Sequence, residues 1–550
     1  HLIKGINMLE AESCKLLLCF PDLHTDMYTR MGIRSYGKDL AAKIKEVVET
    51  GTTGTLENLR KKLPPGIADL LRIQGLGPKR VGVLYKELNI GSLDQLREAA
   101  EAGRIRVLAG FGEKTEKKIL ESIHARADAG ARFLRASAEP YAESIVAYLK
   151  EIPGVREVVL AGSYRRARET VGDLDVLVAG GESGAVMDRF TAFDEVKEVL
   201  ARGPTKSSVI LRPGLQVDLR MVEPASFGAA LNYFTGSKAH NIALRRLGQQ
   251  RGLKINEYGV FEGERPVGGA TEEEVYRSVG LAWIPPELRE DRGEIEAARE
   301  GRLPRLVEYE NLRGDLHSHT TASDGKSTIE EMAIGARARG FEYLAITEHS
   351  KRLTVAGGLD EDELAKQVDE IDRINENLEG FTLLKGIEVD ILEDGSLDLP
   401  DSILRRLDLV IGSVHTHFNL GGEKQTERIL RAMDRPCFTM MGHLTGRLLL
   451  QRNGYDVDVP RIIRHAKERG CFIELNSHPQ RLDLTDIHCA TAREEGVLVS
   501  VNSDAHTMND FDVLHFGIGQ ARRGWLEKKD VLNTRPLNSL RPLLAGTMGK

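Results

Sequence analysis

The segment DLHSHTTASDG, residues 315–325, determines how the second half of this chain is interpreted. It places His317 and His319 one residue apart, and Asp324 follows five residues after His319. Alternate residues of a strand project to the same side, so both imidazoles can face one pocket. A lone histidine is usually a core or surface residue, so the meaning of this pair depends on what the rest of the chain places beside it.

The region after residue 312 alternates between strand-like and helix-like segments. Amphipathic runs such as STIEEMAIGARARG and VPRIIRHAKERG separate most of the apolar segments. Seven segments are strand candidates: GDLHSHT, YLAITEHS, LLKGIEVDI, DLVIGSVHTH, CFTMMGHL, CFIELNSH and VLVSVNSDAH. This alternation predicts a seven-stranded parallel β/α barrel.

Each of these seven segments ends in side chains that can bind a metal. In chain order they are His317 and His319, His349, Glu388, His415 and His417, His443, His478, and Asp504 and His506, with Asp324 in the first loop. The carboxyl ends of barrel strands open on one face, where active sites are built. Imidazole and carboxylate ligands suit Zn, Mn or Fe, and so many exceed the needs of one ion. The sequence therefore predicts two or three clustered ions that activate water against a phosphoester.

A second group of carboxylates lies in the first half, in GSYRRARETVGDLDVLV, residues 162–178. Asp173 and Asp175 are alternate residues of a predicted strand, and Asp218 in QVDLR can join them from a neighbouring strand. Three carboxylates holding two Mg²⁺ ions can bridge a nucleoside triphosphate and activate an attacking hydroxyl. The Gly162–Ser163 turn and Arg166 are predicted to hold the outer phosphates.

Residues 30–130 are helical in pattern and contain two G-x-G turns, Gly75-Leu76-Gly77 and Gly110-Phe111-Gly112. Each turn opens a lysine-rich helix. Glycines permit close approach, and the exposed amides at a helix start can hold a phosphate. These repeats look like helix-hairpin-helix grips on a DNA backbone.

Composition agrees with a multidomain protein whose two ends differ in charge. The 550 residues exceed one hydrophobic core. Residues 1–150 hold 24 Lys and Arg against 19 Asp and Glu, whereas residues 301–550 hold 32 against 40. A basic front permits a nucleic-acid partner. The five cysteines are scattered and no apolar stretch is long enough to span a membrane, which predicts a cytoplasmic protein with reduced thiols.

Residues 313–530 resemble a PHP (polymerase and histidinol phosphatase) domain. The resemblance implies a metal-dependent hydrolase, and its nine ligand positions all hold residues that can bind a metal here. They are His317, His319, Asp324, His349, Glu388, His415, His443, Asp504 and His506. His417 and His478 lie outside this set, with a structural role as the alternative to metal or substrate contact.

Residues 30–285 resemble an X-family DNA polymerase. The resemblance implies that Asp173, Asp175 and Asp218 are the catalytic metal ligands and that Ser163, Arg166 and Gly172 contact the triphosphate. In NYFTGSKAHN, it implies that Tyr233, Phe234 and Gly236 line the sugar pocket and that Asn241 reads the minor-groove edge of the incoming base. It also aligns Lys43 with a Schiff-base lysine of 5′-deoxyribose phosphate lyases. A polymerase followed by a PHP domain is the order of bacterial and archaeal X-family polymerases.

Four regions are expected from these patterns. They are a helical DNA-binding and lyase-like region (1–130), a nucleotidyltransferase palm with fingers and thumb (131–285), a linker (286–312) and the PHP barrel (313–550). The expected protein is a monomeric DNA-repair enzyme that takes gapped, nicked or primer-template DNA and a dNTP. Mg²⁺ or Mn²⁺ serves the polymerase, and two or three Zn²⁺ or Mn²⁺ ions serve a 3′–5′ exonuclease and abasic-site endonuclease. The alternatives are a nucleotidyltransferase fused to a small-molecule phosphoesterase, and a DNA-binding repair scaffold with inactive sites.

Overall fold

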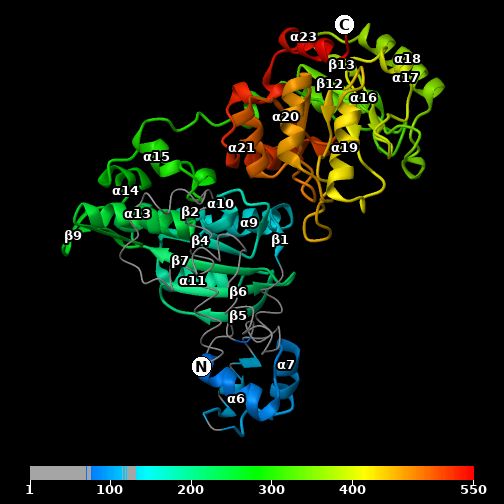
Figure 1. The fold of residues 1–550 in the computed structure, drawn as a ribbon. Coiled ribbons are helices and arrows are strands. Elements are labelled where there is room, and N and C mark those ends of the chain that lie inside the picture. The colour runs from blue at the N-terminus through cyan, green and yellow to red at the C-terminus, as the bar shows by residue number, and fades with distance from the viewer. Residues whose placement is uncertain are drawn as a thin grey trace, which may run out of the picture. The chain divides into compact units, whose positions relative to one another are not determined.

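The computed structural model describes residues 70, 76–108, 110–113, 115–117, 119–120 and 132–549 (Figure 1). Contacts divide the chain into two compact units, residues 1–131 and 132–550. In the first unit, α6 (Pro78–Leu88) and α7 (Leu93–Glu101) contribute to one buried apolar cluster. Pro78 at the first turn suits a helix start, and Ser92 caps α7 by accepting a hydrogen bond from the Gln95 amide.

The second unit begins with a five-stranded sheet in the order β2-β4-β7-β6-β5 (Figure 1). Strands β4 and β7 run parallel at its centre, and the other neighbours in the sheet are antiparallel. A short pair, β1 (Phe133–Leu134) with β3 (Thr170–Val171), lies outside this sheet. The five strands are β2 (Val155–Leu160), β4 (Asp173–Gly180), β5 (Val196–Arg202), β6 (Lys206–Leu211) and β7 (Gln216–Val222).

Alternation along the central strands decides which side chains meet the helices. Leu174, Val176 and Val178 of β4 join the buried cluster that includes α9 (Arg135–Lys150) and α11 (Ser183–Thr191). Leu177, on the opposite face, packs with Ala230 of α12 (Phe227–Thr235). Because Asp173 and Asp175 have the same parity as Leu177, they belong to the α12 face.

A smaller helical and β region follows α12. It contains α13 (Lys238–Gln250), α14 (Glu272–Ser278) and a meander of β8 (Leu253–Asn256), β9 (Gly259–Glu262) and β10 (Arg265–Gly268). Leu244, Ile255, Val260 and Tyr276 form its core. The short helices α10 (Gly162–Arg165) and η1 (Pro224–Ser226) lie in the connections of the larger sheet.

The stretch 286–312, expected to be a linker, is instead folded onto its neighbours. It forms η2 (Pro286–Leu288), α15 (Glu294–Arg299) and η3 (Tyr309–Asn311), and Leu288 and Ile295 are buried in the preceding core. Its charged residues suggest solvent exposure, but Arg289 and Glu294 are fully buried. Arg289 pairs with Glu272, and Glu294 pairs with His240, so partners elsewhere in the chain make this burial possible.

The remaining strands are parallel and form the predicted barrel. They are β11 (Gly314–Asp315), β12 (Tyr343–Ile346), β13 (Thr382–Lys385), β14 (Glu388–Asp390), β15 (Ile411–Ser413), β16 (Met440–Met441), β17 (Phe472–Asn476) and β18 (Val499–Asn502). Only Gly386 and Ile387 separate β13 from β14, so the two are one interrupted strand that pairs with β12 on one side and β15 on the other. A parallel bridge between Ser318 and Ala505 joins the first and last strand segments. The predicted seven-strand order is therefore confirmed.

Helices cover the outside of these strands (Figure 1). They are α16 (Ile329–Ala338), α17 (Glu361–Asn375), α18 (Asp401–Leu404), α19 (Gly422–Met433), α20 (Val459–Arg469), α21 (Asp486–Glu495), α22 (Leu514–Arg523) and α23 (Leu537–Thr547). Single 3₁₀ turns occur at η4 (Thr354–Ala356), η5 (Asp510–Val513), η6 (Lys528–Asp530) and η7 (Leu532–Thr534). None of the helices in the described residues is both long and apolar enough to cross a bilayer.

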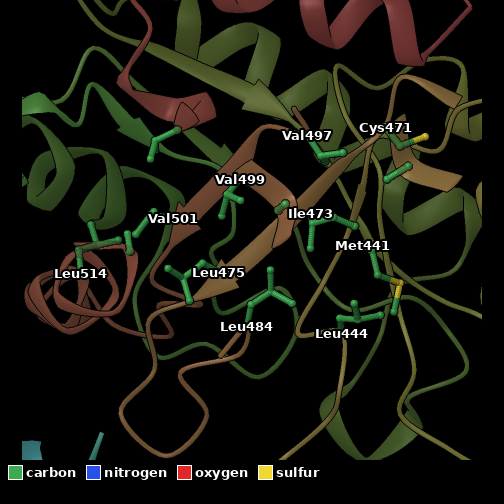
Figure 2. Close-up of a cluster of buried hydrophobic side chains, with 14 of the residues drawn as sticks. Met441, Leu444, Cys471, Ile473, Leu475, Leu484, Val497, Val499, Val501 and Leu514 are labelled. Atoms are coloured by element: carbon green, nitrogen blue, oxygen red, sulfur yellow. The ribbon is translucent and has the colours of Figure 1, made fainter. Parts of the chain in front are cut away.

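Figure 2 shows the apolar layer between the strands and their helices. Ile473 and Leu475 of β17 and Val499 and Val501 of β18 contribute to it. Because alternate residues of a strand face opposite sides, Glu474 and Asn476 of β17 face the inside of the barrel. This alternation is what positions polar side chains for the site described next.

Candidate functional site

Glu388 lies at the centre of the side chains that the barrel strands bring together. Its Oε2 is 2.8 Å from His349 Nδ1, and its Oε1 is 2.9 Å from His443 Nε2 and 3.4 Å from His415 Nε2. His317 Nε2 lies 3.6 Å from Glu388 Oε2. One buried carboxylate from β14 therefore touches histidines that follow four other strands.

The ligand atoms form three adjoining groups, each spanning no more than 4.8 Å. The groups are His319, Asp324, His349 and His506; His317, His319 and Asp504; and His349, Glu388 and His415. His319 and His349 are each shared by two groups. Eight of the nine predicted ligands are in these groups, and His443 is joined to them through Glu388.

Unpaired polar atoms in this pocket fit bound cations. His319 Nδ1 and His443 Nδ1 are buried and have no hydrogen-bond partner among the described residues. The Nε2 atoms of His317 and His319 approach to 3.1 Å, where two lone pairs would repel unless a proton or cation lies between them. Buried polar groups without partners are costly, and divalent ions would satisfy them.

The pocket attracts positive charge strongly. Burial alone would lower the pKa of His349, but Glu388 and Asp324 raise it to about 10. The same balance, with Glu388 and Asp390 as the carboxylates, raises the pKa of His415 to about 9. Burial and then the neighbouring His349 lower the pKa of His319 to about 3. Ions bound here would replace protons, because imidazole coordinates a metal only in its neutral form.

Three further polar residues contact the predicted ligands, and no motif in the sequence singled them out. Glu474 Oε1 lies 2.6 Å from His317 Nδ1, and Asp390 Oδ1 lies 3.0 Å from His415 Nδ1. Asn476 Nδ2 donates to Asp504 Oδ2 at 3.0 Å. Such partners fix the ring tautomer and orientation of ligating histidines. Their sequence signal was the polar side chain at alternate positions of otherwise apolar strands, as in FIELN and EVD.

His417 and His478 do not belong to any of the three groups. His417 Nδ1 pairs with Glu393 at 2.7 Å on the protein surface. His478 follows β17, and burial lowers its pKa. A metal-ligand role therefore stays unsupported for both residues.

The carboxylates of the first half lie on neighbouring parallel strands. Asp175 of β4 is directly opposite Asp218 of β7, and Asp173 is two residues from Asp175 on the same face. Asp218 Oδ2 lies 2.8 Å from Lys206 Nζ, a residue that the sequence analysis did not single out. The three carboxylates are not among the groups within 4.8 Å found in the described residues, and the Lys206 ammonium neutralises Asp218 instead.

The three carboxylates differ in pKa because they differ in burial and in their charged neighbours. Burial, together with Asp173 and Asp218, raises the pKa of Asp175 to about 7. Burial and then Asp218 also raise the pKa of Asp173. Burial would raise the pKa of Asp218 as well, but Lys206 and hydrogen bonds from Gln216 and Ser208 lower it. Like charges held this close favour binding of divalent cations.

The predicted triphosphate contacts lie in the connections next to this sheet. Ser163 is in α10, Gly172 precedes β4, and Gly162 adopts a φ of +61°. A Cβ on Gly162 would lie 2.4 Å from Asp175 Oδ2, so the turn requires glycine. Arg166, which follows α10, donates to the carbonyl of Thr235 and, at 3.0 Å, to Glu290.

The predicted sugar and base contacts lie on α12 and α13. Tyr233 and Phe234 of α12 pack edge to face with ring centroids 5.1 Å apart. Gly236 ends α12, and a Cβ there would lie 3.1 Å from Arg166 Nη1. Asn241 of α13 is buried and donates to the Tyr233 carbonyl at 2.7 Å. The two predicted nucleotide segments are thus joined through Arg166 and Gly236.

The glycine turns of the first unit are open toward their surroundings. Gly77 caps α6, and Gly110 has a φ of +85°. A Cβ on Gly77, Gly110 or Gly112 would meet no atom of the described residues within 4 Å. The surrounding space therefore leaves room for a ligand to reach these amides. Gly75 and Lys43 lie outside the described residues.

Three family models match parts of the chain. A SAM-like helix-hairpin-helix tandem matches residues 67–125, the DNA polymerase beta thumb matches residues 230–290, and the PHP domain matches residues 315–478. The three matched ranges follow one another in the chain and correspond to the helical, nucleotidyltransferase and barrel regions.

A DNA polymerase/3′–5′ exonuclease PolX of Bacillus subtilis (strain 168) is 39% identical over 524 residues, which cover 94% of this chain and 92% of the relative. A probable phosphatase of Thermoanaerobacter sp. (strain X514) is 32% identical over 231 residues, or 40% of this chain and 89% of the relative. A crystal structure of Leishmania infantum polymerase beta in a ternary P/T complex covers 40% of this chain and 96% of that chain. Its identity is 20% and its TM-score is 0.34, which does not establish a shared fold.

Proposed function

The chain belongs to the family X DNA polymerases that carry a PHP domain, and from this membership we propose that it is a bifunctional gap-repair enzyme. Its nucleotidyltransferase half is a DNA-directed DNA polymerase, and its barrel is a metal-dependent 3′–5′ exonuclease. We further propose that the polymerase fills short gaps during DNA repair in the cytoplasm and that the enzyme acts as a monomer.

In the polymerase site, Asp173, Asp175 and Asp218 would hold Mg²⁺ or Mn²⁺. Bound ions supply charge neutralisation for the triphosphate and make the primer 3′-hydroxyl more acidic. The turn of Ser163 with Arg166 and Gly172 binds the triphosphate. Asp218 can release Lys206 when a cation replaces the ammonium, because both compete for one carboxylate.

The nucleotide-selecting residues contact the sugar and the base of the incoming nucleotide. Tyr233, Phe234 and Gly236 line the sugar, and Asn241 reads the minor-groove edge of the base once its amide leaves the Tyr233 carbonyl. Gly75, Gly77, Gly110 and Gly112 hold the DNA backbone through their amides, which requires no base sequence. Lys43 is the proposed Schiff-base lysine if the enzyme also removes 5′-deoxyribose phosphate.

In the barrel, the nine ligands would hold two or three Zn²⁺ or Mn²⁺ ions. Bound ions supply hydroxide near neutral pH and neutralise the phosphodiester. Glu474 and Asp390 keep His317 and His415 in the orientation that coordination requires. The observation that carries this assignment is the convergence of nine proposed ligand side chains, Glu388 among them, from six of the seven barrel strands and the loop after the first. We extend the proposal to cleavage at abasic sites.

Another candidate function is a phosphoesterase that acts on small molecules. A relative described as a probable phosphatase, from Acetivibrio thermocellus, is 34% identical over 201 residues, or 35% of this chain. A phosphatase would hydrolyse a phosphomonoester such as histidinol phosphate and leave DNA intact.

A single assay distinguishes these functions. Full-length protein is incubated with Mn²⁺ and 5′-labelled gapped DNA, with and without dNTPs, and in parallel with histidinol phosphate. The proposal expects extension with dNTPs and 3′ shortening without them. Hydrolysis of histidinol phosphate with intact DNA would favour the phosphatase, and no reaction with either substrate would favour an inactive scaffold.

A further inference from the structure

The segment 162–169, which carries Ser163 and Arg166, packs directly on helix α22 of the barrel. Arg523 at the end of α22 is 3% exposed. Its Nη1 donates to the backbone carbonyl of Arg166 at 2.9 Å and to Glu290 Oε1, also at 2.9 Å. Glu290 Oε1 also accepts from Arg166 Nε at 3.0 Å. One barrel arginine thus holds both the backbone of Arg166 and the carboxylate that orients its side chain.

The far end of the same segment has a second anchor in the barrel. Glu169 Oε1 accepts from Gln520 Nε2 at 2.6 Å and from Arg447 Nη2 at 2.5 Å. Gln520 is on α22, one helical turn before Arg523. Two residues on α22 therefore fix residues 166 and 169 of the segment.

A cationic side chain links the middle of the segment to the same helix. The Arg135 guanidinium lies 5.1 Å from the ring centre of Tyr164 and 5.3 Å from that of Phe516 on α22. These distances are within the range of cation–π attraction.

The backbone of the segment adopts an unfavourable conformation that its neighbours hold in place. Ala167 has a φ of +51°, which is unfavourable for a residue with a side chain. Gly519 of α22 lies opposite, where a Cβ would be 3.1 Å from the Ala167 Cβ. At the other end, Gly162 fits against Asp175 with no room for a side chain. The segment is thus fixed between a catalytic carboxylate and a barrel helix.

We propose that α22 is a positioning element of the polymerase site, with Arg523 and Gln520 as positioning residues for the segment that binds the incoming nucleotide. This inference rests on the proposed polymerase function. Helix α22 belongs to the barrel, and it follows the strand-end residues Asp504 and His506 in the sequence. The barrel therefore carries its own hydrolytic site and also contributes to polymerisation through α22. Loss of Arg523 should free the Arg166 carbonyl and leave Glu290 to pair more fully with Arg166, and both changes weaken triphosphate binding.

The test measures single-nucleotide insertion into gapped DNA by full-length protein as dNTP concentration is varied. The variants are Arg523→Ala, Arg523→Lys and Gln520→Ala. Arg522→Ala is the matched control, because Arg522 is on the same helix but contacts Glu287 and the Val307 carbonyl instead of the nucleotide segment. The 3′–5′ exonuclease rate of each preparation is measured without dNTPs as a check on the barrel.

We expect Arg523→Ala to raise the KM for dNTP at least fivefold while kcat and the exonuclease rate stay within twofold of wild type. Arg523→Lys should lie between wild type and alanine, and Arg522→Ala should match wild type. An unchanged KM in both Arg523→Ala and Gln520→Ala would overturn the inference. So would a parallel loss of both activities in both variants, because that pattern indicates a purely structural role. Failure of the wild-type protein to extend the primer would instead refute the proposed polymerase function, and the inference with it.

Discussion

Asp175 of β4 and Asp218 of β7 occupy paired positions on two adjacent parallel strands, with Lys206 bound to Asp218 at 2.8 Å. Burial and the two neighbouring aspartates raise the pKa of Asp175 to about 7. A cation is therefore needed to hold all three carboxylates charged together at neutral pH. Here a lysine supplies part of that charge.

The carboxylate triad predicts the first outcome. Asp173→Ala/Asp175→Ala should reduce primer extension by orders of magnitude, because the ions that these side chains hold carry most of the transition-state charge. DNA affinity, measured by fluorescence anisotropy, should stay near wild type because the glycine turns are unchanged. Extension at even a tenth of the wild-type rate would contradict the assignment.

The glycine turns predict a loss of DNA affinity without a loss of stability. Within the part of the chain that the structure describes, a Cβ on Gly112 meets no atom within 4 Å. Gly112→Val should therefore fold normally while its side chain blocks the approach of a phosphate. Affinity should fall equally for all DNA sequences and should weaken steeply with salt in the wild type. Val107→Ala, at a side chain that is 79% exposed, is the matched control. Sequence-dependent losses or salt-independent binding would argue against these grips.

Glu272 predicts a pH dependence of stability. It accepts two hydrogen bonds from Arg165, both at 2.8 Å, and one from Arg289 at 2.6 Å. Burial would raise its pKa, but these arginines lower it to about 2 from an ordinary value of 4.5. A lowered pKa means that the charged form stabilises the fold. The contribution, roughly 3 kcal/mol, is complete above pH 4.5 and is lost as the pH falls toward 2.

Urea unfolding of wild type and Glu272→Gln between pH 7 and pH 3 measures this contribution. The difference in unfolding free energy should be largest at pH 7 and should shrink as the pH falls below about 4.5. A difference that stays constant over this range would show that Glu272 acts through packing alone.

The contact between Glu474 and His317 predicts that Glu474 affects metal affinity without binding an ion itself. Glu474→Gln keeps the shape of the side chain but removes the charge that holds His317 in place at 2.6 Å. Metal affinity should fall about 10- to 100-fold, which is the usual effect of losing such a partner. Metal content at defined free Mn²⁺, measured with the exonuclease rate, tests this. Unchanged primer extension in the same preparation is the internal control.

The sequence predicted the barrel and the clustering of its strand-end side chains because strand ends of a parallel barrel must open on one face. The polar alternation in FIELN marks Glu474 as facing away from the apolar layer, but it does not identify its partner His317, which lies 157 residues away in the sequence. It also predicted that residues 286–312 were a linker. Their charges look solvated, but Arg289 and Glu294 have buried partners that only the tertiary structure supplies. The contacts of Arg523 with the nucleotide segment were hidden for the same reason.

The central claim is that two separate metal sites in one chain perform the two reactions. The most direct test measures primer extension and 3′–5′ exonuclease activity side by side on His349→Ala and on Asp173→Ala/Asp175→Ala. His349 is shared by two of the three ligand groups, so its loss should remove at least one ion and abolish exonuclease activity while extension persists. The double variant should show the reverse. Exonuclease activity that persists in His349→Ala and disappears in the double variant would place the nuclease outside the barrel and contradict this account.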